Sequence, residues 1–149
     1  MKLSTREDIK VPIDAAFRAV TDFDGIERRL VARGIPVTRT GDLEPGQLGA
    51  LWIARVPWRN RIHDLEAELV MVDPGQGVAV ESRVAGLVCL GVVDLLALSE
   101  GETRLFASVD VRPTTMSSRL LLQSLRLMRR SLARRFRDRV ASLAAGIGG

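Results

Sequence analysis

Residues 2–17, KLSTREDIKVPIDAAF, decide the fold at the start of the chain. The even-numbered residues up to Lys10 are charged or polar and the odd-numbered ones are mostly apolar, which is the period of two of a half-buried strand. The inner face of this strand is expected to carry Leu3, Thr5, Glu7, Ile9 and Val11. Pro12 follows, and proline is favoured at the first position of a helix because its missing N–H needs no partner there. Apolar residues then recur at helical spacing over 13–20, so the stretch predicts a strand that turns through proline into a short helix.

A second short helix is predicted directly after the first. Asp24 is followed three residues later by Glu27, which is the spacing of a capping box, and Gly34 can end the helix because glycine accepts a positive φ. A strand over 35–40 and a turn over 43–49 come next. The chain therefore passes from two short helices into a sheet.

The next two strands are predicted to form a hairpin over 51–58 and 62–72. A two-residue loop at 59–60 pairs Trp58 with Arg61, and this register keeps the apolar sets of both strands on one face. That inner face is expected to carry Trp52, Ala54, Val56, Trp58, His63, Leu65, Ala67, Leu69 and Met71.

Three further strands are predicted over 78–84, 87–99 and 103–111. Glu100 and Gly101 join the last two through a two-residue turn, in which the glycine can take a positive φ. On the first of these strands the inner residues are Val78, Val80, Ser82 and Val84. Across the last two strands the turn pairs Leu96 with Leu105, Asp94 with Ala107 and Val92 with Val109.

This register points Val92 and Asp94 toward the inside and leaves Cys89 as an outer-face or covered thiol. An inward carboxylate among apolar neighbours has its pKa raised by desolvation unless it finds a partner. The alternative is that the strand bulges or rotates, so that Asp94 reaches water or an arginine.

Residues 115–145 predict one long amphipathic helix. Its apolar stripe, at steps of three and four, consists of Leu121, Leu125, Met128, Leu132, Phe136, Val140 and Leu143. The opposite face is cationic and carries Arg119, Arg126, Arg130 and Arg137.

Taken together, the order is one strand, two short helices, six antiparallel strands and a long C-terminal helix. This order, with the opening residues 7–17 and the Asp22-Phe23-Asp24 at the end of the first helix, resembles the helix-grip fold of the SRPBCC superfamily. That superfamily includes START lipid-transfer domains, birch-pollen-allergen-like proteins, aromatic polyketide cyclases and coenzyme Q-binding proteins. The resemblance covers essentially the whole chain. It implies one α+β domain over 1–149, in which a curved seven-stranded antiparallel sheet wraps around the final helix and leaves a mostly apolar cavity.

Composition excludes several other classes of protein. With 149 residues, 46% hydrophobic and 27% charged, the chain suits one folded domain and is not typical of disorder. The single cysteine excludes an intramolecular disulfide, and the charged start does not resemble a secretory signal, so we expect a cytoplasmic location. The most apolar run, 84–93, is too short to cross a bilayer, which needs roughly 20 residues.

The resemblance implies that the cavity binds a hydrophobic small molecule, such as a lipid, polyketide or quinone-like compound, as a carrier, chaperone or sensor. Small inward residues such as Ala54 and Ala67 favour an open cavity, although Trp52 or Phe17 can fill the space and leave a packed core instead. The residues expected to line the cavity are Glu7, Trp52, Val56, Trp58, His63, Leu65, Ser82, Val92, Asp94, Ala107, Leu125, Met128 and Leu132.

The alternative that the protein is a cyclase- or dehydratase-like enzyme depends on Glu7, His63 and Asp94 as candidate acid–base groups. His63 and Asp94 are expected about 26 Å apart along the strands, so they are not a dyad. Glu7 lies about 10 Å from Asp94 if it faces Ala107. Each of the three side chains also has a purely structural interpretation. The chain has no tyrosine and no recognisable nucleophile or phosphate motif, so the sequence favours binding over catalysis without deciding between them. We expect no cofactor and no metal site.

The arginines suggest a third possibility. From Arg112 to Arg139 the chain has nine arginines and one aspartate, a net charge of +8, so the remainder carries −4. The face with Arg119, Arg126 and Arg130, continued by Arg137, can dock on an anionic membrane or on RNA, or can simply be solvated. Aromatic residues that would stack on bases are missing from it, which makes nucleic acid the less favoured partner.

Overall fold

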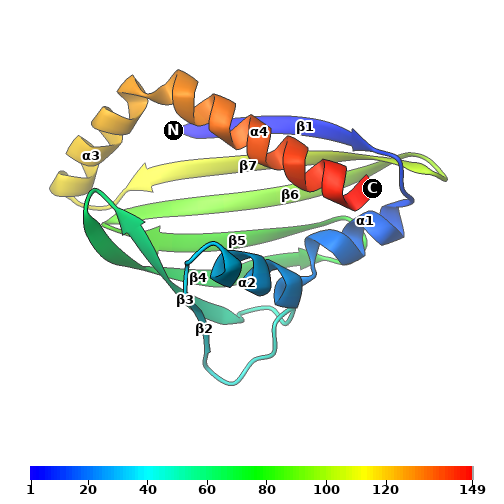
Figure 1. Cartoon of the computed structure of the whole chain (residues 1–149), viewed down its shortest axis with the longest axis horizontal. Coiled ribbons are helices and arrows are strands. Elements are labelled where there is room, and N and C mark those ends of the chain that lie inside the picture. Colours follow the sequence, from blue (N-terminus) through cyan, green and yellow to red (C-terminus); the bar gives the residue numbers. More distant parts are fainter. Residues whose placement is uncertain (149) are drawn as a thin grey trace.

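The computed structural model describes residues 1–148 and contains one antiparallel sheet with its helices on one side (Figure 1). The seven strands lie in the order β1-β7-β6-β5-β4-β3-β2. In chain order the elements are β1 (Lys2–Ile9), α1 (Ile13–Val20), α2 (Phe23–Ala32), β2 (Val37–Thr40), β3 (Leu51–Trp58), β4 (Arg61–Asp73), β5 (Gly77–Val84), β6 (Leu87–Ser99), β7 (Glu102–Pro113), α3 (Met116–Leu127) and α4 (Arg129–Gly148). The predicted α+β helix-grip architecture, with two short helices after the first strand, is confirmed.

The opening strand has the predicted sidedness. Burial alternates along β1, with the odd-numbered side chains covered and the even-numbered ones exposed. Pro12 has an extended backbone and is the N-cap of α1, whereas the sequence predicted it as the first residue of the helix. The strand pairs with β7 so that Glu7 lies opposite Leu105, and Ala107 lies opposite Thr5. The expected pairing of Glu7 with Ala107 was therefore wrong by two residues. Because side chains alternate with a period of two, Glu7 still lies on the predicted face.

The β3–β4 hairpin has the predicted register. Trp58 pairs with Arg61 and Val56 with His63. The two loop residues, Arg59 and Asn60, have φ of 52° and 61°. Two consecutive positive φ angles identify the tight turn whose twist matches that of the flanking strands.

Two β-bulges overturn parts of the predicted pattern. On β6 the pairing shifts between Ala97 and Ser99, so Leu98 is an extra residue and Asp94 lies opposite Phe106 instead of Ala107. One extra residue moves every side chain beyond it to the other face. The prediction that Val92, Asp94 and Leu96 point inward was therefore wrong. Cys89 lies on the inner face and is half-buried, so of the two alternatives for this thiol the covered one holds and the outer-face one does not. A second bulge, between Leu69 and Met71, turns Met71 out to 37% exposure.

The predicted C-terminal helix is interrupted. Met128 separates α3 from α4, and its N–H bonds to the carbonyl of Leu125 at 3.0 Å. No glycine or proline causes this break. Instead the two segments pack in different places, because Leu122 of α3 joins a cluster with Leu87 and Val111, whereas Val140 of α4 packs over Leu105. No helix within residues 1–148 combines the length and apolarity needed to span a bilayer.

The apolar core consists of three separate clusters on the inner face. The first lies under α1 and α4 and includes Ile9, Leu95 and Val140. The second lies under α1 and α2 around Leu69, and the third lies under α3 around Leu122. Helix α4 runs along β1 at one margin of the sheet (Figure 1). The centre of the inner face therefore lies between clusters, not inside one.

Leu69 is the position where the sheet tolerates loss of volume least, because its side chain is fully buried in the second cluster. We expect Leu69→Ala to lower the free energy of unfolding by about 2–5 kcal/mol, measured by urea denaturation. Leu127→Ala is the matched control, since Leu127 is 89% exposed, and should change stability by less than about 0.5 kcal/mol. Equal effects of the two substitutions would contradict this account of the core.

Candidate functional site

The candidate site is the part of the inner face that the three clusters leave half-buried. We call it the inner surface, and it consists of Val56, His63, Leu65, Val80, Ser82, Cys89 and Val109. Val80 packs against the second cluster, and Cys89 and Val109 pack against the third, so the inner surface includes the half-buried margins of these two clusters. It crosses β3 to β7. Val56 pairs with His63, Ser82 pairs with Cys89, and Ala67 opposite Ser82 joins β4 to β5. Because the core is divided into three clusters, an apolar area of the inner face is left half-buried where the helices cover the sheet only in part.

The outer face of the same strands has a different chemistry. There the half-buried apolar residues are concentrated on β6, and charged rows flank them. Arg83 lies 2.9 Å from Glu81 and 3.6 Å from Glu66, and Arg104 is bonded to Asp8 at 2.7 Å. The outer face has one apolar row across neighbouring strands, in which Ala79 pairs with Val92 and with Met71, and the charged rows flank it. The inner face is therefore the less charged of the two for an apolar molecule.

Few polar groups reach the inner surface. The His63 ring lies 5.6 Å from the ring of Trp58, and the Trp58 ring is covered on one side by the Arg59 guanidinium at 4.8 Å. Burial raises the pKa of the Cys89 thiol, which keeps it protonated and weakly nucleophilic at neutral pH. Within residues 1–148 every buried side-chain nitrogen and oxygen has a hydrogen-bond partner. The surface is thus suited to apolar contact with one or two polar anchors.

The three acid–base candidates do not come together. Glu7 lies on the inner face of β1, in a groove of about 400 Å³ between the end of β1 and α4. Because Glu7 pairs with Leu105, and His63 lies beyond the level of Pro113, at least eight residues separate them, or about 26 Å along the strands. Among residues 1–148, Glu7, His63 and Asp94 therefore form no acid–base pair at the inner surface.

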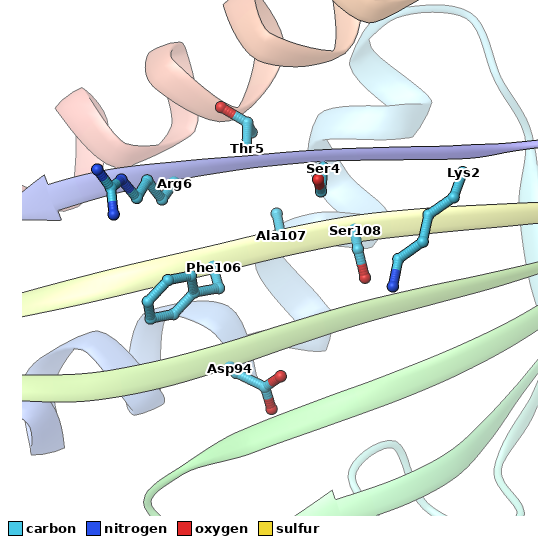
Figure 2. A pocket seen from close by; sticks show the side chains of 8 residues that line it. All are labelled: Lys2, Ser4, Thr5, Arg6, Asp94, Phe106, Ala107 and Ser108. Carbon is cyan, nitrogen blue, oxygen red and sulfur yellow. The ribbon is translucent and has the colours of Figure 1, made fainter.

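Asp94 lies in a hollow on the outer face. The hollow has a volume of about 280 Å³ and extends over β1, β7 and β6 (Figure 2). Asp94 is exposed there, near Phe106 and the cationic Lys2 and Arg6. Asp94 and Glu7 thus lie on opposite faces of the sheet, and the expected 10 Å approach between them was wrong.

The sequence interpretation missed a polar network that fixes α2 to the sheet. Glu27 accepts hydrogen bonds from Arg39 Nε at 2.7 Å and from the indole N–H of Trp52 at 2.8 Å. Arg39 also pairs with Asp24. The Arg39 guanidinium, followed by the Trp52 indole, holds the pKa of Glu27 below its usual range. The residue that caps α2 is Asp22, whose carboxylate accepts from the Gly25 N–H at 3.1 Å, so the predicted Asp24–Glu27 capping box was wrong.

Trp52 is 8% exposed and lies against Phe23 at 5.4 Å, so its ring belongs to the second cluster. Its N–H is already donated to Glu27, which leaves no indole donor for a ligand. Sequence alone gives little signal of such a network, because its members are far apart along the chain.

The other predicted lining residues are distributed around the inner surface. Ala107 is buried beneath α4 in the first cluster, whereas Leu125 and Leu132 are half-buried. Met128 is 46% exposed at the break between α3 and α4. The four predicted docking arginines are all exposed, namely Arg119, Arg126, Arg130 and Arg137. Among residues 1–148 no three histidine, cysteine or acidic side chains are grouped to hold a metal ion.

No protein-family model matches the sequence, and no curated protein matches it. Solved structures do match the fold. Norcoclaurine synthase from Thalictrum flavum has a TM-score of 0.69 at 11% identity, with 99% of this chain and 91% of that chain covered. The Zhui aromatase/cyclase from Streptomyces has a TM-score of 0.68 at 14% identity, covering 99% and 93%. Ara h 8.0201 has a TM-score of 0.61 at 14% identity, covering 78% and 79%. At these identities the likeness establishes the helix-grip fold.

The Glu27 network gives a pH-dependent contribution to stability. A carboxylate whose pKa is lowered by folding contributes stability above its unfolded pKa of about 4.5, and this contribution is lost as the pH falls through the folded value. We expect Glu27→Gln to destabilise the protein by about 1–2 kcal/mol at pH 7 and progressively less below pH 4.5, measured by urea unfolding across pH. Asp64→Asn, which removes an exposed pair with Arg55 at 3.5 Å, is the control and should have little effect at any pH. A Glu27→Gln effect that is independent of pH would rule out the ionic network.

Proposed function

We propose that the protein binds one hydrophobic small molecule, such as a lipid, polyketide or quinone-like compound, on the inner surface, as a carrier, chaperone or sensor. The observation that supports this proposal most directly is the half-buried apolar area between the three core clusters. A surface of this kind is stable in water only at a cost, which an apolar ligand removes by covering it. The fold it shares with an aromatase/cyclase adds support by analogy.

Burial of apolar area would supply most of the affinity. An aromatic group that buries about 200 Å² of apolar area gains about 5 kcal/mol at about 25 cal/mol per Å². Larger ligands that extend from Val109 on β7 to Val56 on β3 gain more. His63 and Ser82 are the polar groups on this path, and we propose that they orient a ligand hydroxyl or carbonyl by hydrogen bonding.

An enzymatic role has weaker support. Acid–base catalysis of ring closure or dehydration needs a donor and an acceptor that reach one substrate. Glu7 and His63 lie near opposite corners of the inner face, and Asp94 lies on the other face of the sheet. Binding without turnover is therefore the function that the arrangement favours.

Filling the inner surface should weaken the binding of a hydrophobic probe. We expect N-phenyl-1-naphthylamine, a neutral probe that fluoresces in apolar surroundings, to bind the wild-type chain at a single saturable site. Ser82→Trp places an indole in the middle of the inner surface and should weaken binding by about tenfold or more, since it removes most of the contact area. The measurement is a direct fluorescence titration of each protein.

Leu96→Trp is the matched control, because Leu96 is 51% exposed on the outer face. It should leave probe affinity unchanged. If both substitutions weaken binding equally, or if Ser82→Trp has no effect, the probe site lies elsewhere and the proposal is wrong.

The single cysteine gives an independent measurement. Because only the thiolate reacts and burial raises the pKa of Cys89, iodoacetamide should alkylate the folded protein more slowly at pH 8 than the urea-unfolded chain. A saturating amount of the naphthylamine probe should slow the reaction further, since Cys89 is part of the inner surface and pairs with Ser82. Alkylation that proceeds at the same rate with and without the probe would contradict a site that covers Cys89.

A further inference from the structure

Helix α3 has large apolar side chains on its solvent-facing side. Met116 is 75% exposed, Leu120 is 65% exposed and Leu127 is 89% exposed. At about 100° per residue these three side chains lie within about 40° of one another around the helix axis. We call them the α3 stripe. On the opposite side of the same helix Ser118 and Leu122 are buried. The helix therefore has apolar residues on two faces, and only one of these faces packs against the sheet.

Arginines run alongside the α3 stripe. Arg119 and Arg126 are exposed and lie about 60–80° from the α3 stripe on one flank, and Arg130 follows at the start of α4. Residues 111–137 contain no aspartate or glutamate. Among the described residues, Arg119, Arg126 and Arg130 form no ion pair within 4.0 Å, unlike Arg112, which lies 3.2 Å from Asp110. The outward side of α3 is therefore apolar in the middle and cationic at its margin.

The helix is positioned so that a flat surface can reach it. In Figure 1, α3 forms the left end of the molecule and turns away from α4, with its far side free of other elements. It is held at its N-terminus, where Thr114 donates to the Gly86 carbonyl and the hydroxyls of Thr115 and Ser118 bond each other at 3.0 Å. The cap therefore fixes the direction of the helix without covering the α3 stripe.

We propose that α3 docks on the surface of an anionic lipid bilayer, with the α3 stripe inserted among the lipids and the flanking arginines on the headgroups. An exposed apolar stripe with cationic margins is the pattern of a helix that lies in the plane of a membrane interface. Nucleic acid fits less well, because apolar side chains occupy the centre of the face and no aromatic residue lies on α3. A second copy of the chain would bring two cationic margins together. This docking does not require that the inner surface binds a ligand.

The test is co-sedimentation of the full chain with vesicles. We expect binding to vesicles of phosphatidylcholine and phosphatidylglycerol in equal parts at about 0.1 M NaCl, little binding to phosphatidylcholine alone, and weaker binding at about 0.5 M NaCl. The triple variant M116S/L120S/L127S keeps every charge, and the double variant R119Q/R126Q keeps every apolar residue. Each should lower the partition coefficient by about tenfold or more. The control V31S/L96S removes apolar residues that are 55% and 51% exposed elsewhere, and should bind as the wild type does.

All variants must show the same midpoint of thermal unfolding. If M116S/L120S/L127S unfolds early, it is replaced by the single substitution Leu127→Ser, at the most exposed of its three positions.

Three outcomes would overturn the proposal. Failure of the wild-type chain to sediment with anionic vesicles at low salt contradicts docking. Binding to single-stranded RNA that the arginine variant loses and the apolar variant keeps assigns the face to nucleic acid. A wild-type dimer in sedimentation velocity that M116S/L120S/L127S converts to a monomer assigns it to self-association.

Discussion

The structure depends on one constraint, which is that every strand must turn its apolar residues toward the same side of the sheet. In a β-strand adjacent side chains point to opposite faces, so a shift of a single residue in pairing reverses the face of a whole segment. The three core clusters, the inner surface and the charged outer face all follow from how this constraint is met strand by strand. At the β3–β4 hairpin a two-residue turn with positive φ at Arg59 and Asn60 meets it directly. At the β6–β7 hairpin it is met only by inserting Leu98 as a bulge.

The contrast between the two hairpins explains how much of the fold could be predicted from sequence. The order of elements and the faces of β1, β3 and β5 could be predicted, because each depends on a local alternation. The bulge at Leu98 could not, because its cause lies in the core. Without it Asp94 would face the first cluster in place of Leu95, which is 7% exposed there, and a buried carboxylate without a partner is costly. The sequence did indicate a conflict, because its alternation placed the Asp94 carboxylate inward among apolar neighbours. The bulge, which was the alternative to that placement, turns Asp94 to the outer face.

The C-terminal helices show a different limit of sequence interpretation. One continuous apolar stripe from Leu121 to Leu143 predicts one helix, and neither glycine nor proline marks the break at Met128. The break arises because α3 and α4 each bury a different face. In α4 the buried positions are Val140 and Ala144, while Leu143 is left 54% exposed. Such a change of face depends on what the sheet presents beneath each helix, which periodicity alone does not contain.

These features also give the two ends of the inner face different numbers of supporting contacts. One end is held by α1 and α4 over the largest cluster, together with the fully buried hydroxyl of Thr103, which donates to the Val11 carbonyl at 2.9 Å. The other end is held by a small cluster and by the cap that joins α3 to Gly86. Local opening is easiest where few apolar contacts oppose it, so α3 is the element expected to move without unfolding the sheet. Because α3 packs over Cys89 and Val109, such movement changes access to the inner surface from the same end that carries the exposed apolar stripe.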